Sequence, residues 1–169
     1  MKVNCDSGAI SESYASSTTD LIDVITTWPV GMPVRPMEKL LGIGETAITL
    51  IAEGLSRWRD DKSRDLLWLV VVLGELRHPA AIEPLVNQLR QITVDVFATA
   101  AAEALAKIGS PAVPALVDAT TAPDPYFRLY TYATLGWIED EKAYAALING
   151  LARDYELGHV LANALAEQG

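Results

Sequence analysis

The sequence predicts an all-α fold: a right-handed α-solenoid of about four helical hairpins over residues 45–169, preceded by an N-terminal capping segment. The first observation is an internal repeat of two apolar stretches. The first stretches begin at Ala47, Ala81, Ala112 and Ala143, with offsets of 34, 31 and 31 residues. The second stretches end with motifs that begin at Leu73, Leu105, Leu135 and Leu165, with offsets of 32, 30 and 30 residues, so the period is near thirty. Such a period is typical of stacked hairpins, because each unit needs its neighbours to bury its apolar faces.

Composition and charge narrow the possible partners. Half of the 169 residues are apolar and 21% are charged, which indicates an ordered chain. The net charge of −9 repels phosphate backbones, and the lysines and arginines are scattered and form no basic patch, so no nucleic-acid partner is expected. A DNA-repair solenoid is disfavoured because it needs a basic inner face, and the acidic balance favours a protein partner with basic patches. The longest strongly apolar run, residues 66–73, is too short to span a bilayer. With Cys5 as its single cysteine and no apolar signal sequence, the chain is expected in the cytoplasm, away from membranes.

Residues 1–44 are predicted to form a flexible leader and a capping segment, and residues 45–169 the repeat domain. Residues 1–19 are rich in serine, threonine and aspartate, which is typical of a mobile or loosely docked stretch. Apolar side chains at near-helical spacing over residues 20–28 predict a helix with Asp20 as its N-cap.

The stretch that joins this helix to the repeats is rich in proline and glycine. Its three prolines predict an extended connector over residues 28–36. A helical turn is expected over residues 37–41, stopped by Gly42 and Gly44.

Every later segment is predicted to be a helix with marked ends. Caps, prolines and glycines delimit the ranges 45–58, 65–76, 80–90, 94–108, 126–138, 141–153 and 156–167, with a further helix that starts at Ser110-Pro111. The acidic triplet at residues 139–141 is expected to cap the helix that follows it.

The third repeat carries a recognisable pattern. An aspartate begins its second helix, an apolar residue and an arginine follow, and Leu-Gly-x-Ile ends the unit; these residues are Asp124, Phe127, Arg128, Leu135, Gly136 and Ile138. This pattern resembles the HEAT-like repeats of phycobilin lyase subunits and of small bacterial solenoid proteins. Where the arginine would stand, the other repeats have Leu66, Ala98 or Gly158. The resemblance implies a HEAT-like fold, a scaffold role, and, as an alternative, a subunit or chaperone of a bilin lyase-like enzyme.

The residue types that commonly act in catalysis or bind metals do not form a catalytic pattern in this sequence. The two histidines, His78 and His159, are two repeats apart and are not expected to share a metal. The serines cluster in the leader without a glycine elbow or a histidine partner. We therefore expect no catalytic residues, no metal and no cofactor.

Two apolar faces are candidates for contact with other segments. In the first repeat, the helical stripe leaves Leu66, Leu67, Val70 and Val71 facing outward. We expect the N-terminal segment to cover them, and a homodimer through these four residues is the alternative.

In the third repeat, the helical stripe also predicts aromatic side chains that face solvent. They lie on the second helix of the hairpin, and the second helices together form the inner row of the solenoid. Exposed aromatics with a polar atom suit a binding groove. The candidate partner contacts are Tyr126, Arg128, Leu129, Tyr132, Trp137, His159 and Asn163. The predicted function is a non-enzymatic scaffold or adaptor. For the lyase alternative, Arg128 beside Tyr132 would be the start of a site for chromophore carboxylates.

Overall fold

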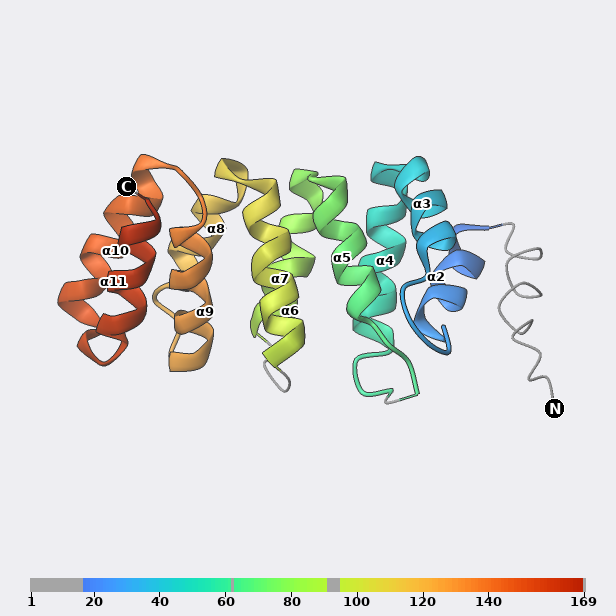
Figure 1. Cartoon of the computed structure of the whole chain (residues 1–169), viewed down its shortest axis with the longest axis horizontal. Helices are drawn as coiled ribbons and strands as arrows, with labels where there is room; N and C mark the ends of the chain where they lie inside the picture. Colours follow the sequence, from blue (N-terminus) through green and yellow to red (C-terminus); the bar gives the residue numbers. More distant parts are fainter. Residues whose placement is uncertain (1–16, 62, 91–94, 169) are drawn as a thin grey trace. The chain divides into compact units, whose positions relative to one another are not determined.

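The computed structural model describes residues 17–61, 63–90 and 95–168, and every regular element in those ranges is a helix (Figure 1). The predicted all-α class is confirmed. The chain forms two compact units, which meet in sequence at Leu76 and Arg77. Most of the predicted leader lies outside the described residues. No helix within the described ranges is long and apolar enough to cross a bilayer.

The first unit contains four described helices that contact one another: α2 (Thr18–Thr26), α3 (Val34–Ile43), α4 (Glu45–Arg57) and α5 (Leu67–Leu76). Helices α2 and α3 pack on α4 and α5, so this compact unit extends to Leu76. The single turn predicted at residues 37–41 is in fact the longer helix α3. Pro36 lies in its first turn, where a missing N–H costs no hydrogen bond.

The N-terminus of α2 is a capping box. The Ser17 hydroxyl accepts a hydrogen bond from the N–H of Asp20 at 3.1 Å, and the Asp20 carboxylate accepts one from the N–H of Ser17 at 3.1 Å. The prediction that Asp20 is the N-cap is therefore wrong, because Asp20 occupies the third helical position and Ser17 is the cap.

Replacing the cap is expected to weaken the first unit slightly. Ser17→Ala removes one acceptor from the exposed end of α2 and should cost about 1 kcal/mol of unfolding free energy. Ser17→Asp, which keeps an acceptor at the same place, is the control and should stay close to the parent. Chemical denaturation measures both. Equal losses in the two variants would contradict the capping box.

Helix α5 is apolar on all sides and is packed on several of them. Leu66 is 7% exposed and Val70 0% exposed, which agrees with the expectation that another segment of the chain covers them. The physical reason is that α2, α3 and α4 all contact α5. Leu67 and Val71 are half-buried. The alternative of a homodimer through these residues therefore lacks an exposed apolar stripe.

A polar link ties the loop before α5 to α2. The Arg64 guanidinium lies 2.6 Å from an Asp23 carboxylate oxygen and donates to the Thr26 hydroxyl at 2.8 Å. The Asp65 N–H donates to the Thr26 carbonyl at 2.8 Å. The same guanidinium stacks 4.2 Å above the Trp58 ring. These contacts support the prediction that the N-terminal segment covers α5.

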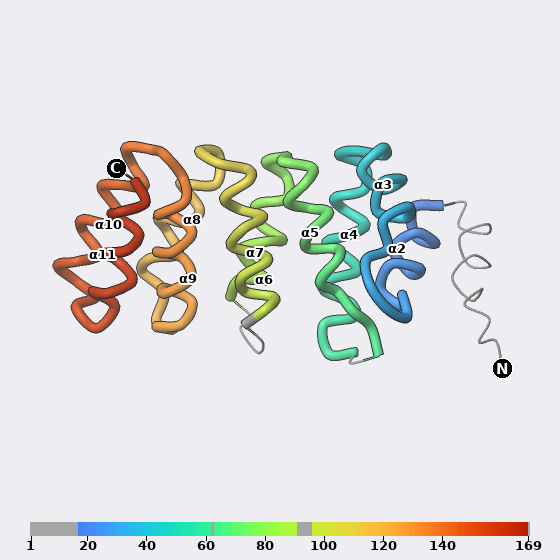
Figure 2. Tube along the Cα trace, viewed as in Figure 1, coloured from blue at the N-terminus to red at the C-terminus, as the bar shows by residue number. Residues whose placement is uncertain are grey.

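The second unit is a stack of three hairpins in two layers (Figure 2). The first-helix layer contains α6 (Ile82–Arg90), α8 (Val113–Ala119) and α10 (Glu141–Arg153). The second-helix layer contains α7 (Asp95–Ile108), α9 (Pro125–Gly136) and α11 (Gly158–Glu167). Short 3₁₀ turns precede α6, α8 and α11 at Pro79–Ala81, Ser110–Ala112 and Tyr155–Leu157. The predicted helices of this region are confirmed within a few residues at each end.

Aspartates start two of these helices. Asp124 accepts from the N–H of Tyr126 at 2.9 Å, and Asp140 accepts from the N–H of Lys142 at 2.8 Å. The Lys142 hydrogen bond is the main reason that the pKa of Asp140 is lowered below its ordinary value. The capping role predicted for the acidic triplet is confirmed for Asp140.

Two glycines allow the last two hairpins to approach closely. A Cβ on Gly136 of α9 would lie 2.7 Å from both Cα and Cβ of Ala164 in α11. A Cβ on Gly150 of α10 would lie 2.8 Å from Tyr132 Cε1 and from Leu161 Cδ2. The glycine of the Leu-Gly-x-Ile pattern is thus a contact point between neighbouring second helices.

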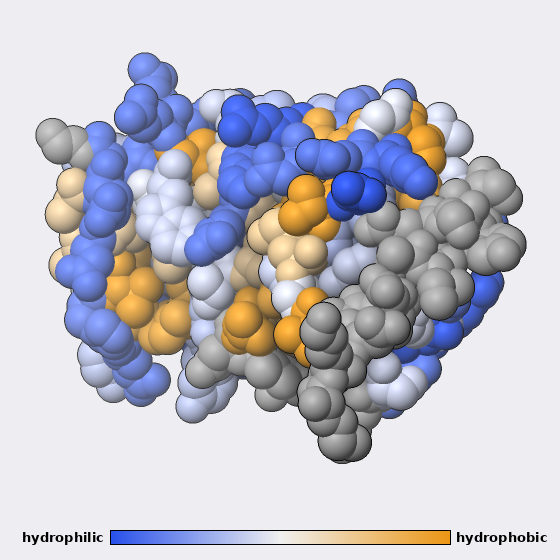
Figure 3. All heavy atoms as spheres, turned by 45° about the vertical axis from the view of Figure 1, so that its right-hand side comes forward, coloured by the Kyte–Doolittle hydropathy of each residue, from blue (hydrophilic) through white to orange (hydrophobic). Residues whose placement is uncertain are grey.

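On the face that Figure 3 shows, hydrophilic residues cover much of the surface and apolar ones gather in separate patches.

Candidate functional site

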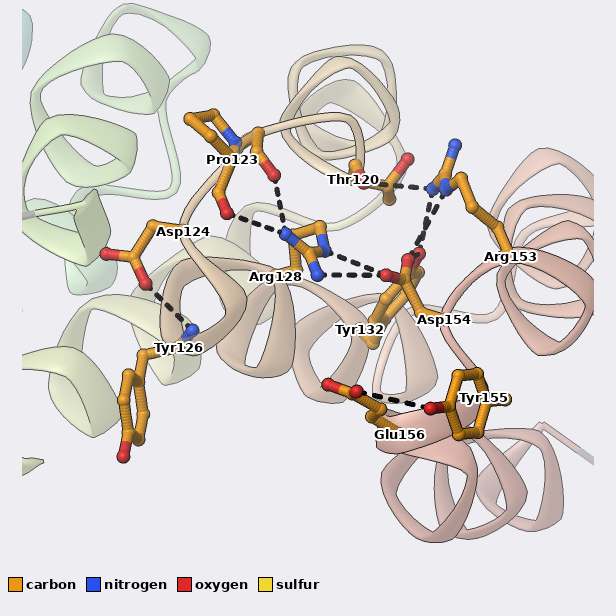
Figure 4. Close-up of polar contacts among 11 residues, drawn as sticks. Thr120, Pro123, Asp124, Tyr126, Arg128, Tyr132, Arg153, Asp154, Tyr155 and Glu156 are labelled. Carbon is orange, nitrogen blue, oxygen red and sulfur yellow. Dashed lines mark hydrogen bonds and ion pairs between the residues drawn. The ribbon is translucent and has the colours of Figure 1, made fainter.

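A polar cluster joins the last two hairpins, with Asp154 at its centre (Figure 4). Asp154 ends α10, and its side chain is 9% exposed. Its Oδ1 accepts from Arg128 Nε at 3.0 Å, and its Oδ2 accepts from the Tyr132 hydroxyl at 2.5 Å. Arg153 Nη2 donates to the Tyr132 hydroxyl at 2.8 Å and to the Thr120 carbonyl at 2.9 Å. The cluster therefore connects α8, α9 and α10.

The electrostatics of this cluster favour an ionised Asp154. Burial raises the pKa of Asp154, but hydrogen bonds from Tyr132 and Arg153 and the charge of Arg128 outweigh burial, so the pKa lies below its ordinary value. Burial, followed by the hydrogen bond to Asp154, raises the pKa of Tyr132. The cluster thus holds one carboxylate between two guanidiniums and a neutral phenol.

Arg128 and Tyr132 make their contacts within the stack of hairpins. Arg128 also donates through Nη1 to the carbonyls of Ala122 and Pro123, at 2.8 and 3.0 Å. Tyr132 is 0% exposed, so the prediction that it faces a partner is wrong. The reason is that α9 is covered on a second side by α10 and α11, which a single core stripe does not take into account. Because Arg128 binds Asp154 and two carbonyls, its contacts give no support to a site for chromophore carboxylates.

The other predicted contacts lie on one outer surface of the second-helix layer. Equivalent positions in α7, α9 and α11 recur with the period of the repeat, as the spacing of Leu105, Leu135 and Leu165 shows. Four such sets are exposed or half-buried throughout, and we call them the second-helix face. They are Val96, Tyr126 and Glu156; Thr99, Leu129 and His159; Glu103, Ala133 and Asn163; and Lys107, Trp137 and Glu167.

The second-helix face combines apolar groups with an excess of carboxylates. Its large apolar side chains are concentrated on α9, where Tyr126 is 68% exposed and Trp137 is 46% exposed. The predicted exposure of Trp137 is confirmed. The equivalent positions on α7 and α11 are mostly smaller or polar. This composition suits a partner that offers apolar groups flanked by cationic ones.

An open groove of about 490 Å³ lies in the other layer, between α6 and α8. The Arg90 guanidinium lies 5.2 Å from the centre of the Phe127 ring at its edge. Asp124, which also lines the groove, uses its carboxylate to cap α9. The groove therefore offers fewer exposed apolar anchors than the second-helix face.

The sequence reasoning missed Asp154 and Arg153. Asp154 stands one full period after Asp124, at the equivalent point of the next repeat, so the period itself was the signal. Arg153 had no such signal, because its role depends on contacts with Thr120 and Tyr132 from other hairpins.

In a comparison with protein families, residues 95–166 match the model of HEAT repeats. This segment covers the whole of α7, α8, α9 and α10 and most of α11. None of the curated proteins compared with the chain matches it.

Proposed function

Since the chain is a HEAT-like repeat protein, we propose that it is a non-enzymatic interaction scaffold that binds a protein partner on its second-helix face. HEAT repeats commonly act as protein-interaction scaffolds, which is the general part of the proposal. The specific part is the face and the chemistry of the partner. One observation carries it: Tyr126 and Trp137 are 68% and 46% exposed on the same face of one repeat.

The exposed aromatics support binding because they are not needed as core. Buried aromatic side chains of α9, such as Phe127 at 1% exposure, stabilise the hairpin, whereas Tyr126 and Trp137 leave much of their area in water. Such residues commonly become the energetic centre of an interface when a partner covers them. The carboxylates of Glu103, Glu156 and Glu167 on the same face favour a partner with lysine or arginine beside its apolar anchors.

The proposed test removes both aromatics. Tyr126→Ala combined with Trp137→Ala should weaken capture of the partner by at least about 30-fold, the equivalent of one well-buried anchor. The double variant should stay folded and lose no more than about 3 kcal/mol of unfolding free energy, because Tyr126 is mostly exposed and Trp137 buries only about half of its area. Proteins captured from the source cell are quantified by mass spectrometry, and stability is measured by denaturation.

Met32→Ala is the control, since Met32 is 53% exposed and belongs to the first unit, outside the second-helix face. The control should capture the same proteins in the same amounts as the parent. If the double variant also keeps them, or if Met32→Ala loses them equally, the second-helix face is not the binding surface.

A further inference from the structure

The hairpin formed by α10 and α11 has an apolar side that no described residue covers. In α10, Tyr144, Ile148 and Leu151 are 49%, 44% and 39% exposed. Their spacing, by four positions and then three, places them in one line along the helix. Among the described residues, this is a run of three large exposed apolar side chains on successive turns of one helix.

The preceding repeat shows which contact residues at these positions make. The equivalent residues of α8, one repeat earlier, are Val113, Val117 and Thr120. Val113 is 1% exposed and Thr120 is 4% exposed, because α10 packs against α8. The exposed line on α10 therefore occupies the positions by which one hairpin holds the next.

The second helix of the hairpin continues the same side. In α9 the positions that meet the next hairpin are Arg128, Tyr132 and Gly136, through Asp154, Gly150 and Ala164 respectively. The equivalent residues of α11, one repeat later, are Gly158, Ala162 and Ala166, which are small and exposed or half-buried. We define the end face as Tyr144, Ile148, Leu151, Gly158, Ala162 and Ala166.

We propose that the end face is a dimer interface, occupied by the end face of a second copy of this chain. The equivalent residues of the preceding hairpin are largely buried against the next hairpin, so the end face has the composition of a surface that is buried in a contact. The small residues of α11 allow a neighbouring helix to come close.

Charge favours a second copy over a foreign basic partner. The residues of the end face include no acidic or basic side chain. A chain with a net charge of −9 repels its own copy over its acidic surfaces, and an uncharged face is where that repulsion is weakest. A basic partner would instead bind to the carboxylates of the second-helix face.

The line on α10 is also suited to pairing with itself. When two α10 helices pair in opposite directions about a two-fold axis at Ile148, Tyr144 of each copy lies beside Leu151 of the other. A large ring then meets a smaller side chain on both sides of the axis, as a closed two-fold interface requires. The dimer would present two second-helix faces and bind a partner with two sites more tightly than one copy can.

Sedimentation of the full chain over a range of concentrations tests the proposal. The parent is expected to form a dimer, and Ile148→Glu to weaken it by at least about 30-fold, because two carboxylates then oppose each other at the axis. Val96→Glu is the matched control: Val96 is 51% exposed on helix α7, away from the end face, and its variant should stay dimeric.

A mixture of two variants tests whether the loss of the dimer is caused by unfolding of the variants. Ile148→Glu and Ile148→Lys should each be monomeric alone and should form a mixed dimer together. A monomeric parent, a dimeric Ile148→Glu, or a failure of the two variants to pair would overturn the proposal. The variant that lacks Tyr126 and Trp137 should still dimerise, so failure here is distinct from failure of the proposed binding face.

Discussion

Asp154→Ala is expected to lower the free energy of unfolding of the second unit by about 3 kcal/mol. The carboxylate accepts hydrogen bonds from Arg128, Tyr132 and Arg153, and its removal leaves a guanidinium and a phenol without their acceptor. Breaking a buried pair from one side costs about 3 to 5 kcal/mol. The lower end applies here, because the Arg128 side chain keeps 19% of its area in solvent.

Urea denaturation of the parent and the variant measures this loss. Asp118→Ala is the matched control, since Asp118 is an exposed aspartate of the neighbouring helix α8, and a surface change of this kind shifts stability by about 0.5 kcal/mol or less. Equal stability of Asp154→Ala and the parent would show that the cluster does not hold the hairpins together.

The cluster also predicts an acid-dependent stability. The pKa of Asp154 is lower in the folded chain than in the unfolded one, so its contribution is complete above the unfolded value of about 4 and is lost as the pH falls through the folded value. Asp154→Asn removes this titration. Between about pH 5 and pH 2, the parent should lose stability more steeply than the variant. Parallel curves would contradict the lowered pKa.

Gly136→Ala should destabilise the same unit by about 2 to 3 kcal/mol. The new Cβ would stand 2.7 Å from the Cα of Ala164, so two helix backbones, and not only a side chain, must move apart. Overpacking of this kind costs about 1 to 3 kcal/mol, and the greater helix propensity of alanine recovers less than about 1 kcal/mol of it.

Gly158→Ala is the matched control within the next helix. A Cβ there meets nothing within 4 Å, and Gly158 has a helical conformation with φ of −54°. This variant should be as stable as the parent or slightly more stable. If Gly136→Ala behaves in the same way, α9 and α11 are not in close contact at this glycine.

The repeat pattern was sufficient to predict the helices of the second unit and the role of its caps. The regular period fixes where helices recur, and aspartates such as Asp140 and the prolines mark where they begin. The same pattern identified the exposed Trp137, because this residue does not belong to the core stripe of α9.

The error at Tyr132 has a clear physical cause. A helical stripe identifies the face that a helix buries inside its own hairpin, but a helix in a stack is also covered by the next hairpin. Tyr132 lies on that second buried side, against Gly150 of α10. Val70 is covered in a similar way within the first unit, where α2 and α3 pack on α5. Contacts between hairpins depend on three-dimensional packing, which a single-helix stripe does not include.

The central claim is that a partner binds on the second-helix face, and site-specific photocrosslinking in the source cell tests it most directly. A photoreactive phenylalanine analogue is placed at position 137 or 126 on this face and, as a control, at the exposed position 145 of α10 in the first-helix layer. The proposal predicts that positions 137 and 126 crosslink the same protein and that position 145 does not. Crosslinking of that protein from position 145, with none from positions 137 and 126, would contradict it.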